Sequence, residues 1–359
     1  MESIYYVLCW HCHRRCKHCY EERFRPYIRE ELESVVAEAE RNAPAIVANL
    51  PERMTYLEAV SDPAPGTAKF VEKTGKIIIS GGDVLTDPVR ERVLYPTLKA
   101  ITSKYRDSGG VKIVVQTTGD LLTPTIINEL IAHGVWTISI SGMDDFHVGM
   151  EGDKKISLAD KVTAMLEAAG VKNASELGER GERSKEEGPI FSMFGATEGS
   201  WIGKLWPRGR AWENNLSKAT LADNFCDAWS GGLNFLNYNY AGSEISIDPT
   251  GDVYPCCIKT AHPLGNLTEE PLLEILDDLV GQPELEAINA GKPERMGLTH
   301  GWDIETFIAA CNTETPAGDE YANLCIGCDR FHKEVLGTVL DARRRARRSQ
   351  RMNVLASSG

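Results

Sequence analysis

The chain has 359 residues, of which 39 are Lys or Arg and 52 are Asp or Glu, so its formal net charge is −13 at pH 7. A protein that binds nucleic acid by neutralising phosphates usually carries the opposite excess, and this balance argues against that class. At roughly 100–200 residues per domain, the length allows two domains, or one large domain with an appendage.

One basic run, RRRARRSQR at 343–351, departs from the acidic average. We interpret it as a solvated helix end or frayed tail, with contact to RNA, an acidic partner or a membrane surface as the alternative. The N-terminal stretch lacks the charged and apolar regions of a signal peptide, and no run approaches the ~18–20 apolar residues of a membrane span. We therefore expect a cytoplasmic protein without a membrane partner, whose ten cysteines are metal ligands or reactive thiols rather than disulfides.

The cysteines fall into two groups that a long cysteine-free stretch separates, which indicates two separate sites. The first group is Cys9, Cys12, Cys16 and Cys19, and the second is Cys226, Cys256, Cys257, Cys311, Cys325 and Cys328.

The first predicted element is a strand, SIYYVL at 3–8, and a C-x3-C-x2-C motif of Cys12, Cys16 and Cys19 follows it. A short loop with this spacing can place three thiolates on one face of a cuboidal iron–sulfur cluster and leave one iron open to a small molecule. Zinc is the alternative. It needs a fourth ligand, which Cys9, His11, His13 or His18 could supply.

Alternating strands and helices are predicted next, in the order that a parallel α/β array requires. A helix at 29–50 precedes a Pro-rich segment, which we interpret as an inserted loop at about 50–75. The further helices are expected within 88–110, 122–134 and 158–170, and the further strands within 76–83, 111–120, 135–147 and 188–198. A charged, glycine-spaced loop is expected at 174–188.

The cysteine motif directly after a first strand resembles the signature of the radical S-adenosylmethionine (SAM) superfamily. Members usually carry an aromatic residue before the third cysteine, where this chain has His18. The strand KIIISGGD resembles the family's second-strand Gly-Gly-Glu motif, with Asp83 in place of Glu.

This resemblance implies an α/β fold, a partial (β/α)6 TIM-like barrel with a [4Fe–4S] cluster at the carboxyl ends of its strands. The open iron would chelate SAM, and reductive cleavage would give a 5′-deoxyadenosyl radical that abstracts a hydrogen atom from the substrate. The electron would come from a reductant such as flavodoxin or ferredoxin.

The expected cofactor-binding residues lie in the motifs and at the strand ends. The resemblance implies His18, Gly81, Gly82 and Asp83, and the strand ends offer Gln116, Thr117, Thr118, Ser139, Ser141, Asp144 and His147. For each strand-end residue, a turn or capping role is the alternative. PRGRAW at 207–212 resembles a Gly-Arg-Ala stretch of many relatives, so Arg208 or Arg210 could hold a carboxylate or phosphate, with a surface salt bridge as the alternative.

The second cysteine group surrounds a predicted β-hairpin, EISIDPTGDVYP at 244–255, followed by an amphipathic helix within 271–279. It resembles the SPASM/Twitch extension of radical SAM enzymes. Position by position, the resemblance implies one auxiliary [4Fe–4S] cluster on Cys226, Cys256, Cys325 and Cys328, because the full form needs seven cysteines and only six are present. A zinc site with the four cysteines is the alternative.

Three cysteines remain without a ligand role: Cys9, Cys257 and Cys311. We expect Cys257, and second Cys311, as catalytic hydrogen-atom donors that quench a substrate radical. In the alternative, Cys256 and Cys257 exchange roles, or the spare thiol is simply buried.

The expected domains are a radical SAM partial barrel at 1–215, a SPASM/Twitch-like domain at 216–335 and a basic helical or disordered tail at 336–359. The expected function is hydrogen abstraction from a small molecule, such as a sugar or nucleoside, leading to oxidation, epimerisation or decarboxylation. The alternative is a peptide maturase with a separate leader-binding partner, since the motif begins too early for a leader-binding domain to precede it. A non-catalytic zinc-binding or electron-transfer protein is the alternative of a different class.

Overall fold

The computed structural model describes residues 1–60, 69–178, 187–197, 202–230 and 233–357, together with residues 183, 185 and 200. Its centre is a nine-stranded sheet with the order β11-β10-β9-β1-β4-β5-β6-β8-β7. Seven neighbouring strands are parallel, from β9 to β7. These are β9 (Glu244–Ile247), β1 (Ser3–Val7), β4 (Lys76–Ser80), β5 (Lys112–Thr117), β6 (Val135–Ser141), β8 (Ile190–Phe194) and the short β7 (Lys172–Asn173).

The parallel strands confirm the expected α/β barrel-like fold. They are rich in Ile and Val, as expected for strands that are covered on both faces. Ile4, Ile77, Val115 and Ile140 are all 0 % exposed. Because the strands run in the same direction, their carboxyl ends lie at one edge of the sheet, where side chains from distant parts of the sequence can meet.

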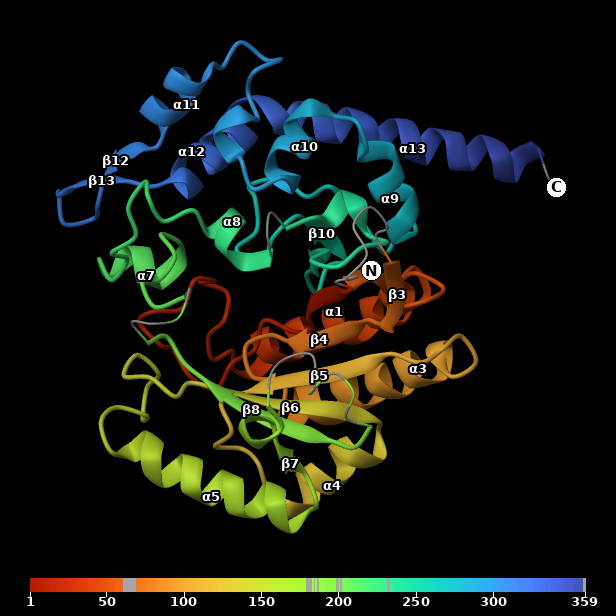
Figure 1. Cartoon of the computed structure of the whole chain (residues 1–359), viewed down its shortest axis with the longest axis vertical. Coiled ribbons are helices and arrows are strands. Elements are labelled where there is room, and N and C mark those ends of the chain that lie inside the picture. The colour runs from red at the N-terminus through yellow and green to blue at the C-terminus, as the bar shows by residue number, and fades with distance from the viewer. Residues whose placement is uncertain are drawn as a thin grey trace.

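The helices of the array lie where the sequence patterns place them. They are α1 (Arg29–Ala48), α2 (Asp87–Val89), α3 (Tyr95–Tyr105), α4 (Pro124–Ala132) and α5 (Lys154–Ala168), with a π-helical turn at Arg90–Leu94 joining α2 to α3. Local signals explain the bounds of α4. Thr123 Oγ1 accepts a hydrogen bond from Ile126 N at 3.2 Å, and Gly134, just past the end, has φ +80°. Figure 1 shows α3, α4 and α5 around the sheet.

The segment at about 50–75, expected to be an inserted loop, instead contains a β-hairpin. Strand β2 (Thr55–Val60) pairs in antiparallel fashion with β3 (Lys69–Thr74), and residues 61–68 lie outside the described residues. Leu57 also exchanges backbone hydrogen bonds with the segment near Tyr240. The segment is therefore attached to the C-terminal part of the chain.

The C-terminal hairpin extends the main sheet. Strand β9 pairs in parallel with β1, and β10 (Asp252–Tyr254) pairs in antiparallel fashion with β9 and with β11 (Gly265–Asn266). The turn needs Gly251, whose φ is +88°. The sheet thus continues across the expected domain boundary at 215/216.

The remaining C-terminal elements gather above the sheet in Figure 1. The expected amphipathic helix is present as α9. The elements are α7 (Gly209–Glu213), α8 (Phe225–Ser230), α9 (Leu272–Leu279), α10 (Pro283–Asn289), α11 (Ile304–Ala310), β12 (Asn312–Glu314), β13 (Glu320–Ala322), α12 (Leu324–Phe331) and α13 (Gly337–Ser357).

The basic run forms part of α13, and most of its arginines pair with acidic residues of the same chain. Arg347 is 6 % exposed and contacts Glu270 through Nε at 2.7 Å and Asp278 through Nη1 at 2.7 Å. Arg344 pairs with Glu269 at 3.1 Å. The helix is therefore attached to the rest of the chain by ion pairs, whereas the sequence suggested a solvated or frayed end. The arginines in these pairs are already neutralised by carboxylates of the same chain, which leaves less positive charge for an RNA contact. None of the helices among the described residues is long and apolar enough to span a membrane.

Candidate active site and auxiliary cysteine centre

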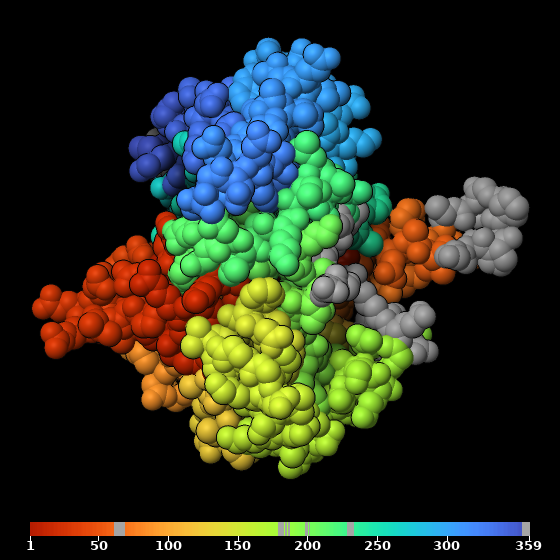
Figure 2. All heavy atoms as spheres, turned by 90° about the vertical axis from the view of Figure 1, so that its left-hand side faces the viewer, coloured from red at the N-terminus to blue at the C-terminus, as the bar shows by residue number. Residues whose placement is uncertain are grey.

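A cavity of about 260 Å³ lies at the carboxyl edge of the parallel strands. It is bounded by the cysteine loop after β1, by the residues that follow β4, β5, β6 and β8, and by the segment before α7. On the face shown in Figure 2, the red N-terminal part of the chain, the yellow part around α5 and the green part around α7 and α8 come together. The expected residues that line this first cavity are Cys12, Cys16, His18, Cys19, Gly81, Gly82, Gln116, Thr117, Thr118, Ser141, Asp144, His147, Arg210 and Cys257.

The three motif cysteines lie together in this first cavity. Cys12 and Cys16 are 8 % and 7 % exposed, and each sulfur accepts a hydrogen bond from a backbone N–H at 3.4 Å, from Arg14 and Val148 respectively. Such N–H donors stabilise a thiolate more than a thiol. Burial raises the pKa of Cys12 and Cys16, so a bound cation is needed to hold these groups as thiolates. The donor set therefore fits an iron–sulfur cluster with three cysteine ligands.

Gly81 and Gly82 let the strand approach the cysteine loop closely. A Cβ atom on Gly82 would lie 2.1 Å from His11 O and 2.6 Å from Cys12 Cβ, and one on Gly81 would lie 2.7 Å from Cys9 O. The close approach permits two backbone hydrogen bonds, from Gly82 N to Cys9 O and from Asp83 N to His11 O, both 3.1 Å. The paired glycines thus hold the loop at the strand end.

Asp83 is fixed by contacts within the protein. It is 1 % exposed and is not among the residues that line the first cavity. Its carboxylate accepts hydrogen bonds from Thr118 Oγ1 at 2.8 Å, from Thr117 Oγ1 at 3.1 Å and from Leu85 N at 3.1 Å. Asp83 therefore orders the ends of β4 and β5, and its expected contact with a cofactor stays a prediction.

Arg210 holds the cysteine loop by its backbone. Nε donates to Cys16 O at 2.9 Å, Nη1 to Glu22 O at 2.9 Å and Nη2 to Phe24 O at 2.7 Å. All three nitrogens of the guanidinium group donate to backbone carbonyl groups, so Arg210 positions the loop, and its expected contact with a cofactor stays a prediction. Arg208 makes an ion pair with Asp329 at 3.1 Å, the kind of contact that the sequence analysis gave as its alternative.

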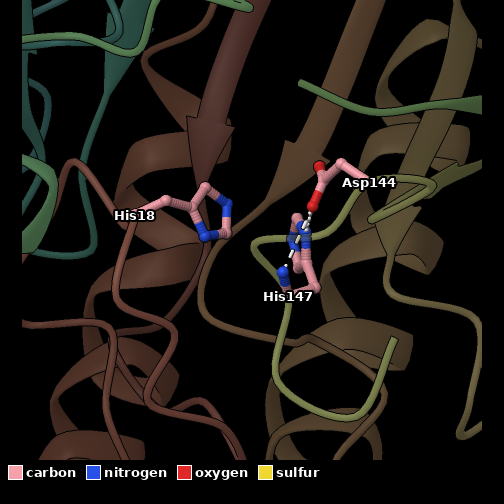
Figure 3. A group of neighbouring side chains, drawn as sticks. All are labelled: His18, Asp144 and His147. Atoms are coloured by element: carbon pink, nitrogen blue, oxygen red, sulfur yellow. Dashed lines mark hydrogen bonds and ion pairs between the residues drawn. The ribbon is translucent and has the colours of Figure 1, made fainter. Parts of the chain in front are cut away.

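Asp144, His147 and His18 form a polar group on one side of the first cavity, drawn in Figure 3. Asp144 Oδ1 lies 2.8 Å from His147 Nδ1, and Asp144 Oδ2 accepts from Ala196 N at 2.9 Å. Burial opposes ionisation of Asp144, but these hydrogen bonds and the charge of His147 lower its pKa. The ring of His18 meets that of His147 edge-on at 4.4 Å, and burial lowers the pKa of His18 to about 4.

These three side chains have the composition of a metal site, with candidate ligand atoms within 4.8 Å of one another. Both oxygens of Asp144 already accept hydrogen bonds, so we interpret the group as a set of contacts that fixes the loop after β6. These contacts also hold the His147 ring at the wall of the first cavity.

Ser139 is the strand-end residue that the structure places elsewhere. Its Oγ lies 3.2 Å from Ser192 Oγ on the neighbouring strand, and Ser139 is not among the residues that line the first cavity. Because side chains alternate along a strand, the next same-face position, Ser141, lines it instead. The sequence identified the strand but not that Ser139 lies too far from its carboxyl end to reach the cavity.

Cys257 lines the first cavity, whereas Cys256 lines a second, smaller one. Cys257 is 2 % exposed and packs in the same cluster as Tyr5 and Tyr20. Tyr5 Oη lies 2.7 Å from Ser80 Oγ and donates to Gln116 Oε1 at 3.2 Å. Sequence reasoning missed these tyrosines, although the strand position of Tyr5, two residues before Val7, puts it on the inner face.

The second cavity has a volume of about 30 Å³, and four cysteines line it: Cys226, Cys256, Cys325 and Cys328. They come from the start of α8, from the loop after β10 and from α12, so separate segments converge there. Burial raises the pKa of all four thiols, and the proximity of the other sulfurs adds to the effect for Cys226 and Cys328. Four buried thiols around one small cavity fit a metal centre, and these are the ligands expected for the auxiliary cluster.

The other two cysteines line neither cavity. Cys311 is 0 % exposed, and its thiol donates to Phe307 O at 3.3 Å. Cys9 is 1 % exposed and packs in the main core. This placement of Cys311 does not support the expected hydrogen-atom donation, because Cys311 does not reach the first cavity.

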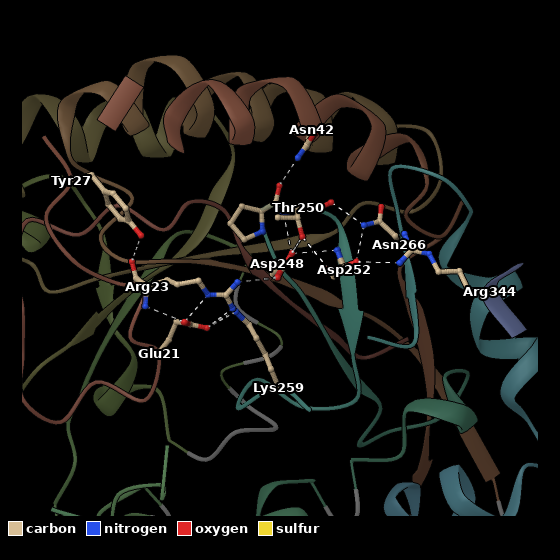
Figure 4. A network of polar contacts seen from close by, with 11 residues as sticks. Glu21, Arg23, Tyr27, Asn42, Asp248, Thr250, Asp252, Lys259, Asn266 and Arg344 are labelled. Atoms are coloured by element: carbon tan, nitrogen blue, oxygen red, sulfur yellow. Dashed lines mark hydrogen bonds and ion pairs between the residues drawn. The ribbon is translucent and has the colours of Figure 1, made fainter. Parts of the chain in front are cut away.

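Buried charges connect the cysteine loop to the C-terminal hairpin, as Figure 4 shows. Lys259 Nζ lies 2.9 Å from Glu21 Oε2, and Arg23 Nη2 lies 2.7 Å from the same oxygen. Burial opposes ionisation of Glu21, but the hydrogen bond from Arg23 and the charge of Lys259 lower its pKa to about 2. Lys259 also lines the second cavity, so the ion pair between Lys259 and Glu21 connects the two cysteine centres. No local pattern in the sequence predicts this ion pair.

Comparison with known families gives one domain match. Residues 239–295 match SPASM, an iron–sulfur cluster-binding domain. The matched residues include β9, β10 and Cys256, whereas Cys226, Cys325 and Cys328 lie outside them. No curated protein matches the chain.

Several solved structures are similar in outline. BtrN in complex with AdoMet and 2-DOIA has 12 % identity over 81 % of this chain and 88 % of that chain, with a TM-score of 0.42. Native anSMEcpe with bound AdoMet has 13 % identity, coverage of 96 % and 99 %, and a TM-score of 0.40. Streptococcus suis SuiB bound to precursor peptide SuiA has 13 % identity, coverage of 76 % and 64 %, and a TM-score of 0.37. All three TM-scores are below 0.5, so the assignment of this chain depends on its own motifs and geometry and on the domain match.

The parallel sheet with the three-cysteine loop at its carboxyl edge agrees with the radical SAM resemblance of the sequence motifs. The domain match shows a SPASM-type iron–sulfur cluster-binding region at 239–295 and confirms that part of the resemblance.

Proposed function

We propose that the chain is an enzyme that binds a [4Fe–4S] cluster and SAM in the first cavity and abstracts a hydrogen atom from a small-molecule substrate there. When bound, the cluster and SAM supply a 5′-deoxyadenosyl radical. The observation that carries the proposal is the convergence of Cys12, Cys16 and Cys19 with the ends of parallel strands in one cavity. Cys12, Cys16 and Cys19 would hold the cluster, and Gly81, Gly82, Thr117 and Thr118 would surround the cofactor.

A compact substrate is supported by the lining of the first cavity. Aromatic side chains, Tyr5, Tyr20, Phe24 and Trp206, form part of its wall, and His147 and Asp144 give it a polar side. Such a mixture of apolar walls and few polar groups is typical of small-molecule sites. A peptide substrate brought by a separate partner is the alternative, and SuiB bound to its precursor peptide is an example of that class.

Cys257 is the residue proposed to act on the substrate radical. Its thiol would transfer a hydrogen atom, forming the product C–H bond and leaving a thiyl radical on Cys257. One electron from a flavodoxin- or ferredoxin-type reductant and one proton would restore the thiol. Such a sequence supports epimerisation, whereas transfer of an electron from the substrate radical to the auxiliary cluster would support oxidation.

The test is 5′-deoxyadenosine formation by anaerobically reconstituted protein with SAM and a reductant. The full chain is expected to hold about eight iron atoms, and about four after Cys12, Cys16 and Cys19 are all replaced by Ala. That triple variant should form no 5′-deoxyadenosine. An unchanged metal content, or colourless protein with zinc in place of iron, would contradict the proposal.

Cys257 has its own test once a substrate is in hand. In ²H₂O the thiol carries deuterium, so a product that receives its hydrogen from Cys257 gains one deuteron. Cys257→Ser should lose that incorporation, whereas Cys311→Ala, a matched change outside both cavities, should keep it. Incorporation that survives in Cys257→Ser would exclude the assignment.

A further inference from the structure

We propose that Arg208 donates a hydrogen bond from Nε to a sulfur of the auxiliary centre and thereby raises the reduction potential of that centre. The inference rests on the proposed function only in requiring that Cys226, Cys256, Cys325 and Cys328 bind an iron–sulfur cluster. The sequence suggested Arg208 as an anion-binding residue or a surface salt bridge; the structure shows an ion pair with Asp329 and, in addition, a buried Nε without an acceptor among the described residues.

The backbone of Arg208 is fixed by the first cysteine loop. Arg208 has extended backbone angles before α7, and the next residue, Gly209, has φ +51°. A Cβ atom on Gly209 would lie 2.5 Å from Tyr20 O and 2.8 Å from Cys19 O, so the chain passes too close to the loop for any other residue. Arg210 then points into the first loop, whereas Arg208 lines the second cavity.

The guanidinium group of Arg208 is held in one orientation at two of its three nitrogens. Nη2 donates to Cys325 O at 3.1 Å, and Nη1 lies 3.1 Å from Asp329 Oδ1. Both partners belong to α12, the helix that carries two of the four ligands. The guanidinium group of Arg208 is therefore held by the same helix that carries Cys325 and Cys328.

The third nitrogen, Nε, is buried and has no hydrogen-bond acceptor among the residues that the structure describes. Buried N–H groups of native proteins are nearly always paired, and a charged one has the most to gain from a partner. The cavity that Arg208 lines is the one bounded by the four ligand cysteines. A cluster sulfide or a cysteine thiolate in that cavity is the acceptor that would satisfy Nε.

A donor at this position favours the reduced state of the centre. A cluster on four thiolates is anionic, and reduction adds a further negative charge. Hydrogen bonds to the sulfurs and nearby positive charge therefore stabilise the reduced form more than the oxidised form. Lys259 also lines the second cavity, but its charge is paired with Glu21 at 2.9 Å. The directed N–H of Arg208 is the contact specific to the auxiliary centre.

The experiment is a potentiometric titration of the full chain with both centres loaded, followed by electron paramagnetic resonance. The variant with Ala at Cys12, Cys16 and Cys19 assigns the signal of the auxiliary centre. Arg208→Gln should reduce the equilibrium constant for reduction about tenfold, a shift of about 59 mV to more negative potential for one electron. Arg208→Lys keeps the charge and should recover less than half of that shift, because lysine lacks an Nε–H in this position.

Arg330→Gln is the matched control. Arg330 lies on α12 beside the ligands, donates to Ala310 O at 3.0 Å and to Asn312 O at 2.9 Å, and is not among the residues that line the second cavity. The reduction potential of the auxiliary centre in Arg330→Gln should equal that in the unmodified protein. An equal shift in Arg330→Gln would show a general charge effect and overturn the assignment of a directed hydrogen bond.

If Arg208→Gln does not retain the auxiliary cluster, a measurement on protein of unmodified sequence tests the proposed hydrogen bond instead. Protein grown with ¹⁵N-guanidino arginine should show ¹⁵N and exchangeable-proton couplings to the reduced auxiliary centre in electron–nuclear double resonance. Absence of both couplings, or an unchanged potential in an iron-replete Arg208→Gln variant, overturns the inference alone. If mutation of the four cysteines leaves the iron content unchanged, the proposed function fails at this centre instead.

Discussion

Replacing Arg210 with Met should destabilise the first cysteine loop by about 3–4.5 kcal/mol. The residue is 5 % exposed, and its three donors contact the carbonyl groups of Cys16, Glu22 and Phe24 at 2.7–2.9 Å. At about 1–1.5 kcal/mol for each buried hydrogen bond, the loss of three gives this magnitude, since water cannot replace the missing donors. Met preserves the length and apolar stem of the side chain, so the lost donors dominate.

Two assays follow the Arg210→Met variant. Urea unfolding followed by circular dichroism gives the free energy of unfolding, and iron analysis after anaerobic reconstitution gives the occupancy of each centre. The iron content should fall to about four atoms per chain, because the disturbed loop is the one that carries Cys12, Cys16 and Cys19. Arg53→Met is the control. Its side chain is 60 % exposed and makes an ion pair with Glu72 at 3.4 Å, which exposed geometry makes weak.

The reasoning is refuted if Arg210→Met keeps both the unfolding free energy and the full iron content. A variant that loses stability but keeps all its iron would show that the loop holds its cluster without the three carbonyl contacts. Either result would show that Arg210 is not needed for the first centre to bind its cluster.

Three further predictions concern packing and ion pairing. Gly82→Ala should cost about 1–3 kcal/mol and about half of the iron, because the added Cβ meets backbone 2.1 Å away. Gly110→Ala meets no atom of the described residues within 4 Å and should cost only about 1–2 kcal/mol through its φ of +77°, with the iron content unchanged; an equal loss of iron in both variants would contradict this. Cys311→Ala should cost about 1–2 kcal/mol by urea unfolding and leave the iron content unchanged, and loss of iron would make the residue a ligand. Arg347→Met should cost about 3–5 kcal/mol by the same measurement, because Glu270 is then buried without its partner, and a cost near zero would show that Glu270 finds water or another cation.

The regular elements of the barrel could be predicted from the sequence because their signals are local. Runs of Ile and Val mark β4 and β5, and Thr123, Pro124 and Gly134 mark the two ends of α4. The hairpin of β2 and β3 was missed because prolines at 63 and 65 suggested a loop, although the flanking residues pair in register.

The grouping of the motif cysteines could also be predicted, since cysteine spacing is itself local information. Cys12, Cys16 and Cys19 meet in one cavity as expected, and Cys256 joins the second. The roles of Asp83 and Arg210 could not be read in this way. Their partners are threonines of another strand and carbonyl groups far along the chain, which only the tertiary structure brings together.

The pairing of β1 with β9 has a consequence for how the molecule is made. Ser3 lies opposite Glu244, so one edge of the first strand finds its neighbour only after most of the polypeptide has been synthesised. Contacts this distant in the sequence form slowly, and an uncovered strand edge invites association with other chains. A fragment that stops near residue 215 should therefore aggregate, and nascent chains of that length should depend on chaperones until the hairpin emerges from the ribosome.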